Sequence, residues 1–380
     1  MRTIQRRISK ATFVLSVAAA CTATAFGRDI HVCNTCAHTT IQSAVNDAAN
    51  GDNILVAQGT YVENVTITGK ALNVVGGPGT TNVVGAGAGR GPVFTLGTPT
   101  VQGTPYLVSI SNLIISGGNH LAGTGDGGGI QVRAGAYLNL SNSTVTGNVA
   151  QSGAGISMST VPGPDYGFSN SITNCYITNN TATASASAIG IGGGIALLAG
   201  NAAISESFII QNQANDGAGV YEGVLAHTLI IDSSTITLNI ANPLVASSGS
   251  TTAGRGGGLF ISSFIRMSFD QVSANRSFGD GSAGMYLIPT PAPADIGFSG
   301  DGPDIEITDF DSNQAGRTTP NPAGIFITGN PSVPVTMIDV TAVLNSANGI
   351  WNNGTILGQN VLVQLNSLSN CAGTGTGCPQ

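Results

Sequence analysis

Short apolar stretches separated by polar residues run through the chain from about residue 50 onward. Within each stretch apolar and polar residues alternate, which is typical of half-buried β-strands. Glycine, asparagine and serine, which favour tight turns, separate the stretches. Helical spacing occurs only earlier, where residues 41–48 carry one apolar stripe. Thr39 or Thr40 is the candidate N-cap of this predicted helix, and Gly51 is its candidate end.

Two short motifs repeat along the chain at regular distances. The first is a small-small-Gly-aliphatic motif, whose aliphatic residue stands at positions 130, 156, 195, 220, 259, 285, 325 and 350. Long and short intervals between these positions alternate. The second motif is an apolar residue, two variable residues and asparagine, and it ends at Asn148, Asn180, Asn212, Asn239, Asn275, Asn313, Asn345 and Asn366.

The repeat predicts an architecture of stacked coils. A unit of this length cannot bury an apolar face alone, but stacked units can. Three short strands per unit, with neighbouring units about 4.8 Å apart, predict an all-β fold. We expect a single-stranded right-handed parallel β-helix with a short N-terminal capping helix, which would cover the open end of the stack.

The two motifs resemble the repeats of polymorphic outer-membrane proteins. Residues 40–77 resemble the N-terminal cap and first coils of pectate-lyase-like β-helix proteins. Together these resemblances imply a β-helix over nearly the whole mature chain. They do not imply one function, because the fold carries lyases, hydrolases, esterases, epimerases, adhesins and stalks. The first family implies display and adhesion, but residues after 366 are too few for its C-terminal membrane barrel.

The N-terminus has the pattern of a secretory signal peptide. A basic segment, an apolar segment and an Ala-Thr-Ala cleavage site occupy residues 1–25. We therefore expect a cap and first coil at 26–75, the β-helix at 76–366 and a tail at 367–380. Localisation would be secreted or cell-surface, in the bacterial extracellular or periplasmic space. No other stretch has transmembrane length.

The net charge of the mature chain limits the kinds of molecule that it can bind. The signal carries four of the 12 basic residues and none of the 19 acidic ones, so the mature net charge is −11. Such a chain should repel nucleic acid. A polysaccharide or cell-surface glycan remains a candidate partner. The sequence does not give the oligomeric state.

The strand after each glycine motif offers the best candidate surface. Its first outward position should form one column along the rod. From the fourth copy onward this column is aromatic: Tyr221, Phe260, Tyr286, Phe326 and Trp351. These side chains could bind sugar rings, bind a protein partner, or lie under loops as a second small core.

An acidic run is the candidate metal site. Asp301, Asp304, Glu306, Asp309 and Asp311 offer the oxygen ligands that Ca²⁺ prefers, although the spacing matches no EF-hand loop. The alternative is a solvated charge run. No other cofactor is indicated.

Catalytic residues are not evident on the candidate face. A polysaccharide lyase or glycoside hydrolase needs carboxylates, with or without a base, from neighbouring coils. Arg255, Arg266, Arg276 and Asp280 lie within 26 residues and could include a catalytic pair, but the low charge density of the chain favours surface decoration. Glu222 falls at an inward position of its strand. We therefore expect a non-catalytic recognition, structural or adhesin-like protein, with a polysaccharide-degrading or polysaccharide-modifying enzyme as the alternative.

The chain contains six cysteines. The segment His31–His38 reads HVCNTCAH, and Ala37 after the second cysteine excludes haem attachment. Zinc bound by its two cysteines and two histidines remains an alternative. In an oxidising compartment Cys33–Cys36 and Cys371–Cys378 are expected as disulfides. Cys175 is expected as a buried thiol.

Overall fold

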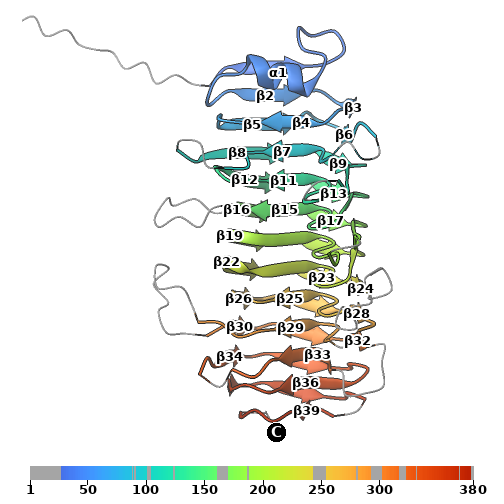
Figure 1. Cartoon of the computed structure of the whole chain (residues 1–380), viewed down its shortest axis with the longest axis vertical. Coiled ribbons are helices and arrows are strands. Elements are labelled where there is room, and N and C mark those ends of the chain that lie inside the picture. The colour runs from blue at the N-terminus through green and yellow to red at the C-terminus, as the bar shows by residue number, and fades with distance from the viewer. Residues whose placement is uncertain are drawn as a thin grey trace, which may run out of the picture.

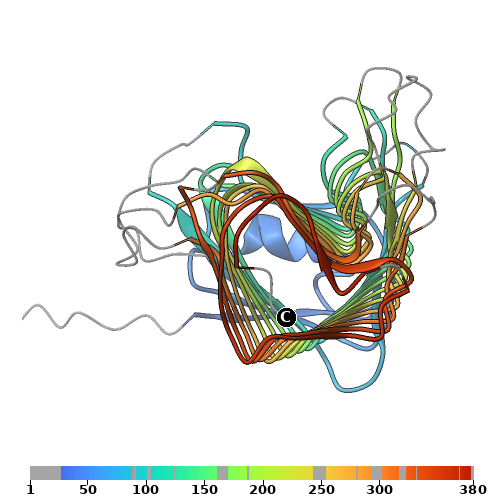
Figure 2. The same cartoon turned by 90° about the horizontal axis from the view of Figure 1, so that it is seen from below.

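The protein is a right-handed parallel β-helix, as the sequence predicts (Figure 1). Its coils stack along one axis, and in the view from below they lie almost on top of one another (Figure 2). The computed structural model describes residues 27–87, 89, 91–100, 104–122, 125–160, 170–185, 188–242, 254–279, 281–291, 302–315, 322–330, 332–367 and 369–377. The predicted signal peptide, residues 1–25, lies outside them.

One helix, α1 (Ile41–Asp47), lies at the N-terminal end of the stack. Thr40 is its N-cap, and the Thr40 side chain accepts a hydrogen bond from the Ser43 N–H at 3.1 Å. Glu63 accepts the first two helical N–H groups at 2.8 and 2.9 Å, which the spacing did not predict. Gly51 is not the end of the helix but lies in the following turn, with φ +91°. The predicted apolar stripe is buried: Ile41, Ala44, Val45 and Ala48.

The strands that follow the glycine motif form what we call the front face. They pair in parallel from coil to coil. The front-face strands are β4 (Val65–Ile67), β7 (Phe94–Leu96), β11 (Ile130–Val132), β15 (Ile156–Ser159), the first parts of β19 (Ile195–Ser205) and β22 (Val220–Asp232), β25 (Leu259–Ile261), β29 (Met285–Leu287), β33 (Pro322–Ile327), β36 (Asn348–Asn352) and β39 (Cys371–Ala372).

A second face belongs to the same hydrogen-bonded sheet, because β19 and β22 continue from the front face into it. It contains the ends of β19 and β22 together with β1 (Asp29–Val32), β2 (Asn53–Val56), β5 (Leu72–Gly76), β8 (Tyr106–Ser111), β12 (Ala136–Ser141), β16 (Asn170–Thr173), β26 (Phe264–Ser268), β30 (Asp304–Glu306), β34 (Val335–Ile338) and β37 (Ile356–Gln359).

A third face is a separate parallel sheet. It contains β3 (Gly59–Val62), β6 (Thr81–Val84), β9 (Ile114–Ser116), β13 (Thr144–Thr146), β17 (Tyr176–Thr178), β20 (Phe208–Ile210), β23 (Thr235–Thr237), β27 (Gln271–Ser273), β31 (Asp309–Asp311), β35 (Thr341–Val343) and β38 (Leu362–Gln364).

Two-residue strands between the third face and the front face form a narrow additional sheet. They are β10 (Asn119–His120), β14 (Val149–Ala150), β18 (Thr181–Ala182), β21 (Gln213–Ala214), β24 (Ile240–Ala241), β28 (Arg276–Ser277) and β32 (Gln314–Ala315).

Glycine is needed at two positions of the glycine motif, for two different reasons of backbone geometry. Its first glycine turns the chain with positive φ, for example +62° at Gly192, where side chains are strained. Its last glycine has no room for a side chain, since a Cβ on Gly194 would lie 2.6 Å from the carbonyl oxygen of Gly219. The motif therefore brings successive coils into close contact just before each front-face strand.

The asparagines of the second motif form a buried ladder inside the corner between the third face and the narrow sheet. Asn239 is typical, with no exposed surface. Its Nδ2 donates to the Ile209 carbonyl at 2.9 Å and to Asn275 Oδ1 at 3.0 Å. Its Oδ1 accepts from the Asn212 backbone N–H at 2.9 Å. Since buried polar groups need partners, the recurring asparagine is a structural element of the coil.

The C-terminal segment contributes to the stack. Within the predicted tail, β39 pairs with β36 through Ile350↔Cys371 and Trp351↔Ala372. Ala372 thereby follows Trp351 in the outward column of the front face.

Candidate functional site

The predicted outward column of the front face is present in the predicted register. Tyr221 pairs with Phe260, Phe260 with Tyr286, Tyr286 with Phe326, and Phe326 with Trp351. Earlier coils place Gln131, Ser157 and Ala196 in the same column. We call the five aromatic side chains the aromatic column.

Four of the rings form one continuous stack. Ring centroids are 5.0 Å apart for Tyr221–Phe260, 5.1 Å for Phe260–Tyr286 and 4.9 Å for Tyr286–Phe326. The corresponding planes differ by only 8°, 2° and 17°. The rings therefore turn their faces to one another and present edges outward, which the sequence pattern could not show. Trp351 is in register with Phe326 and ends the column.

The column is partly covered and partly accessible. Phe260 is only 4% exposed, whereas Tyr221, Tyr286, Phe326 and Trp351 are half-buried. The Arg255 guanidinium carbon lies 4.7 Å from the Phe260 ring centroid and 5.3 Å from that of Tyr286. Such cation–π contacts stabilise both the charge and the rings.

Arg255 is held in place by Asp216, a fully buried carboxylate. Arg255 Nε and Nη2 both donate to Asp216 Oδ2. Asp216 Oδ1 accepts the backbone N–H groups of Gly254 and Arg255 at 3.0 and 2.9 Å. Burial alone would lower the pKa of Arg255, but the bonds and charge of Asp216 raise it overall. The interpretation of Arg255 as surface decoration is therefore wrong, because it anchors the aromatic column.

The charged neighbours also affect Tyr221. Burial raises the pKa of its phenol, and the negative charge of Asp216 raises it further, while Arg255 opposes both. The hydroxyl therefore remains protonated at neutral pH and can donate a hydrogen bond.

The acidic run does not assemble into one group of ligands. Asp304 and Glu306 lie on β30 of the second face, and Asp309 and Asp311 on β31 of the third. Asp304 forms an ion pair with Arg266 at 3.4 Å. Asp301 lies outside the described residues. Within the part of the chain that the structure describes, no three His, Cys, Asp or Glu side chains could hold a metal ion.

Glu222 does point inward, as its position predicts, and it is fully buried. Neither carboxylate oxygen makes a hydrogen bond among the described residues. Burial raises its pKa well above the ordinary value, and the nearby Ser263 backbone acts in the opposite direction. Glu222 is therefore a core residue whose neutral form is favoured, beside an irregular stretch where the pairing of β19 with β22 shifts register.

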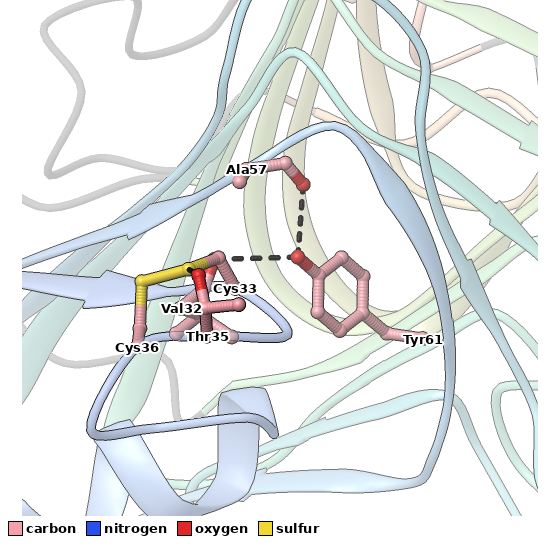
Figure 3. The surroundings of a disulfide bond; sticks show 6 residues. All are labelled: Val32, Cys33, Thr35, Cys36, Ala57 and Tyr61. Atoms are coloured by element: carbon pink, nitrogen blue, oxygen red, sulfur yellow. Dashed lines mark hydrogen bonds between the residues drawn. A yellow bond between two sulfur atoms is a disulfide. The ribbon is translucent and has the colours of Figure 1, made fainter.

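The HVCNTCAH segment contains a disulfide, as predicted (Figure 3). The Cys33 and Cys36 Sγ atoms are bonded to each other, so neither is present as the thiolate that would bind zinc. The Tyr61 hydroxyl lies 3.2 Å from the Val32 carbonyl oxygen and 3.0 Å from that of Ala57, tying the first turns together. Cys175 is a buried free thiol, and burial raises its pKa to about 11. Cys371 is disulfide-bonded, while its predicted partner Cys378 lies outside the described residues.

Comparison with known proteins gives fold likeness alone. No family model and no curated protein matches the chain. The pectate lyase Pel9A structure is 12% identical with a TM-score of 0.42, over 89% of this chain and 79% of that one. A deglycosylated pectin methylesterase from Aspergillus niger is 13% identical with a TM-score of 0.27, over 94% and 92%. Neither likeness adds to what the strand pairings already show.

Membrane-spanning helices are not found in the described ranges: none of their helices combines the length and apolarity needed to cross a bilayer.

Proposed function

We propose that this protein is a secreted, non-catalytic recognition protein that contacts a glycan through the aromatic column. One observation carries the proposal: four outward rings on consecutive coils are fixed in a single stack, yet three of them remain half-exposed. Side chains that are already ordered lose little conformational entropy when a ligand binds. The Asp216–Arg255 pair maintains this order from one side of the stack.

The geometry suits an extended polymer. The column runs along the axis of the rod, so a chain lying along it would meet a new ring about every 5 Å. Ring edges and the hydroxyls of Tyr221 and Tyr286 would meet sugar hydroxyls, and C–H groups would pack on the aromatic surface. Trp351 is half-buried at the end of the column, and the small Ala372 follows it in register.

The ionisable groups beside the rings support binding rather than proton transfer. Both oxygens of Asp216 already accept hydrogen bonds, and its negative charge is matched by Arg255. A general base or acid must reach the proton of a substrate. Asp216 is buried beneath Arg255 and serves as an anchor for it.

A polysaccharide panel tests the proposal, with and without Ca²⁺. The full chain should retain at least one polysaccharide without shortening it. The triple variant Tyr286→Ala, Phe326→Ala and Trp351→Ala should lose retention by at least tenfold while keeping its β-sheet circular dichroism. The matched control is Tyr176→Ala with Phe208→Ala, which removes a stacked pair from the third face.

Two results would reject the proposal. Equal retention by the triple variant and wild type would show that the rings do not bind the polymer. New reducing ends or unsaturated products with the wild-type chain would establish the enzymatic alternative, a polysaccharide lyase or glycoside hydrolase.

A further inference from the structure

A small polar pocket lies on the front face before the aromatic column. Its volume is about 210 Å³, and Gln131 and Ser157 line it together with Asp126 and Arg133. Gln131 and Ser157 are paired neighbours in the outward column, on β11 and β15. The column then continues through Ala196 to Tyr221. The pocket and the aromatic column therefore belong to one surface.

Two side chains of the pocket have buried oxygen atoms that make no hydrogen bond within the described part of the chain. Gln131 is 4% exposed and Ser157 is 1% exposed. Among the residues that the structure describes, Gln131 Oε1 and Ser157 Oγ make no hydrogen bond. Burying such groups unsatisfied costs free energy, so adjacent examples at one pocket need an explanation. A ligand with hydroxyl groups would supply the missing partners.

The pocket is also lined by one positively charged and one negatively charged side chain. Arg133 is half-buried and has no ion pair within the described ranges. Asp126 lies across the same pocket, and its backbone carbonyl accepts a 2.7 Å hydrogen bond from His120 Nδ1. A guanidinium and a carboxylate together can donate to and accept from vicinal hydroxyls. A bound anion would meet the repulsion of Asp126.

We propose that this pocket binds one neutral sugar residue, as a terminal subsite for the glycan that crosses the aromatic column. This inference rests on the proposed function. Its volume lies below the roughly 300–1,000 Å³ of pockets for drug-sized molecules, which suits a single monosaccharide. The net charge of −7 over the whole chain adds a long-range bias against acidic polymers.

Titration of the full chain with single sugars tests the subsite. The probes are the methyl glycosides of glucose, galactose, mannose and N-acetylglucosamine, with galacturonic acid as the charged counterpart, followed by saturation-transfer NMR. We expect millimolar binding of at least one neutral glycoside and at least fivefold weaker binding of galacturonic acid. Gln131→Leu with Ser157→Val should lose this binding at least tenfold and raise the melting temperature, because both unsatisfied groups are removed.

The outcomes separate the two proposals. Phe326→Ala should retain single-sugar binding at the pocket while weakening polysaccharide retention. The subsite is rejected if the Gln131→Leu/Ser157→Val variant binds the glycoside as wild type does, or if no neutral glycoside binds. Preferential binding of galacturonic acid would also overturn it, in favour of an anion site at Arg133. None of these results tests glycan binding by the aromatic column, which the variants of the aromatic residues test separately.

Discussion

Two ladders of identical or similar side chains run along this rod, one inside and one outside. The asparagine ladder is buried, and its members satisfy one another and the backbone, as at Asn212, Asn239 and Asn275. The aromatic column is on the surface, and among its five rings Phe260, the second, is the buried one. Both arise from the same repeat period in the sequence.

The difference between the ladders separates structural from functional repetition. The asparagine recurs in eight successive copies because each coil needs the same turn. The outward column changes from Gln131 and Ser157 to five aromatic residues, although the backbone register is maintained. A position that changes while its backbone stays constant is free to serve binding, so we place function on the outer column.

Breaking the interior ladder should have the largest effect on stability. Asn239→Leu would leave the Asn212 backbone N–H and the Ile209 carbonyl without their Asn239 partner. Each buried group left unsatisfied costs roughly 1–3 kcal/mol. We expect a loss of about 4–5 kcal/mol in unfolding free energy, measured by denaturant titration. Gln213→Ala, at an exposed position directly after Asn212 in the preceding coil, should cost below about 0.5 kcal/mol. Equal losses would contradict a special role for the ladder.

Removing Asp216, which holds Arg255 beside the aromatic column, should have the next largest effect on stability. Asp216→Ala would leave the Arg255 charge without its carboxylate, over Phe260 and Tyr286. Breaking such a partly buried pair from one side costs about 3 kcal/mol.

Asp216→Ala combined with Arg255→Met should recover the part of that loss that comes from the unpaired charge, but not the part that comes from the Gly254 and Arg255 N–H groups, which lose Asp216 Oδ1. Thermal and denaturant unfolding of wild type and of the two variants would decide. If the double variant is no more stable than Asp216→Ala alone, the pair does not act as a charge anchor.

Much of the fold follows from the sequence because the repeat fixes register. The spacing of the glycine motifs placed the aromatic side chains in one column, and it placed Glu222 inward. The cap and the Cys33–Cys36 disulfide follow from local patterns. In each of these cases the relevant partners are near in sequence or separated by one repeat.

The site could be predicted only in part. Asp216 and Arg255 are 39 residues apart in the sequence, and their contact depends on side-chain geometry that the repeat spacing does not encode. The stacking of ring faces depends on side-chain torsions that spacing does not encode. The pocket at Gln131 and Ser157 depends on how the Asp126 and Arg133 side chains are placed around it, which the spacing of the motifs does not encode.

The smallest predicted effect is a pH dependence at a third ladder, the hydroxyl column of Ser143, Ser207 and Ser234. In the next coil Asp270 replaces serine and accepts the Ser234 and Ser268 N–H groups at 2.8 and 3.1 Å. Burial raises the pKa of Asp270 from 3.8 to about 7, because the two hydrogen bonds only partly offset it. A folded-state pKa above the unfolded value means that stability is fully present at low pH and is lost as pH rises towards 7.

Between pH 5 and pH 8 wild type should therefore lose about 2–3 kcal/mol of unfolding free energy through this group. Asp270→Ser restores the side chain found in the preceding coil, whose Oγ accepts the Ser207 N–H at 3.2 Å and donates to the Asp232 carbonyl at 3.0 Å. The melting temperature of the variant should fall less than that of wild type between pH 5 and pH 8, since Glu222 remains as a buried carboxyl, and the variant should be more stable than wild type at pH 8. A wild-type melting temperature that stays constant from pH 5 to 8, or an equal pH dependence in the variant, would show that the charge of Asp270 is accommodated. In that case the hydroxyl column would accommodate the charge of Asp270, as the aromatic column accommodates the charge of Arg255.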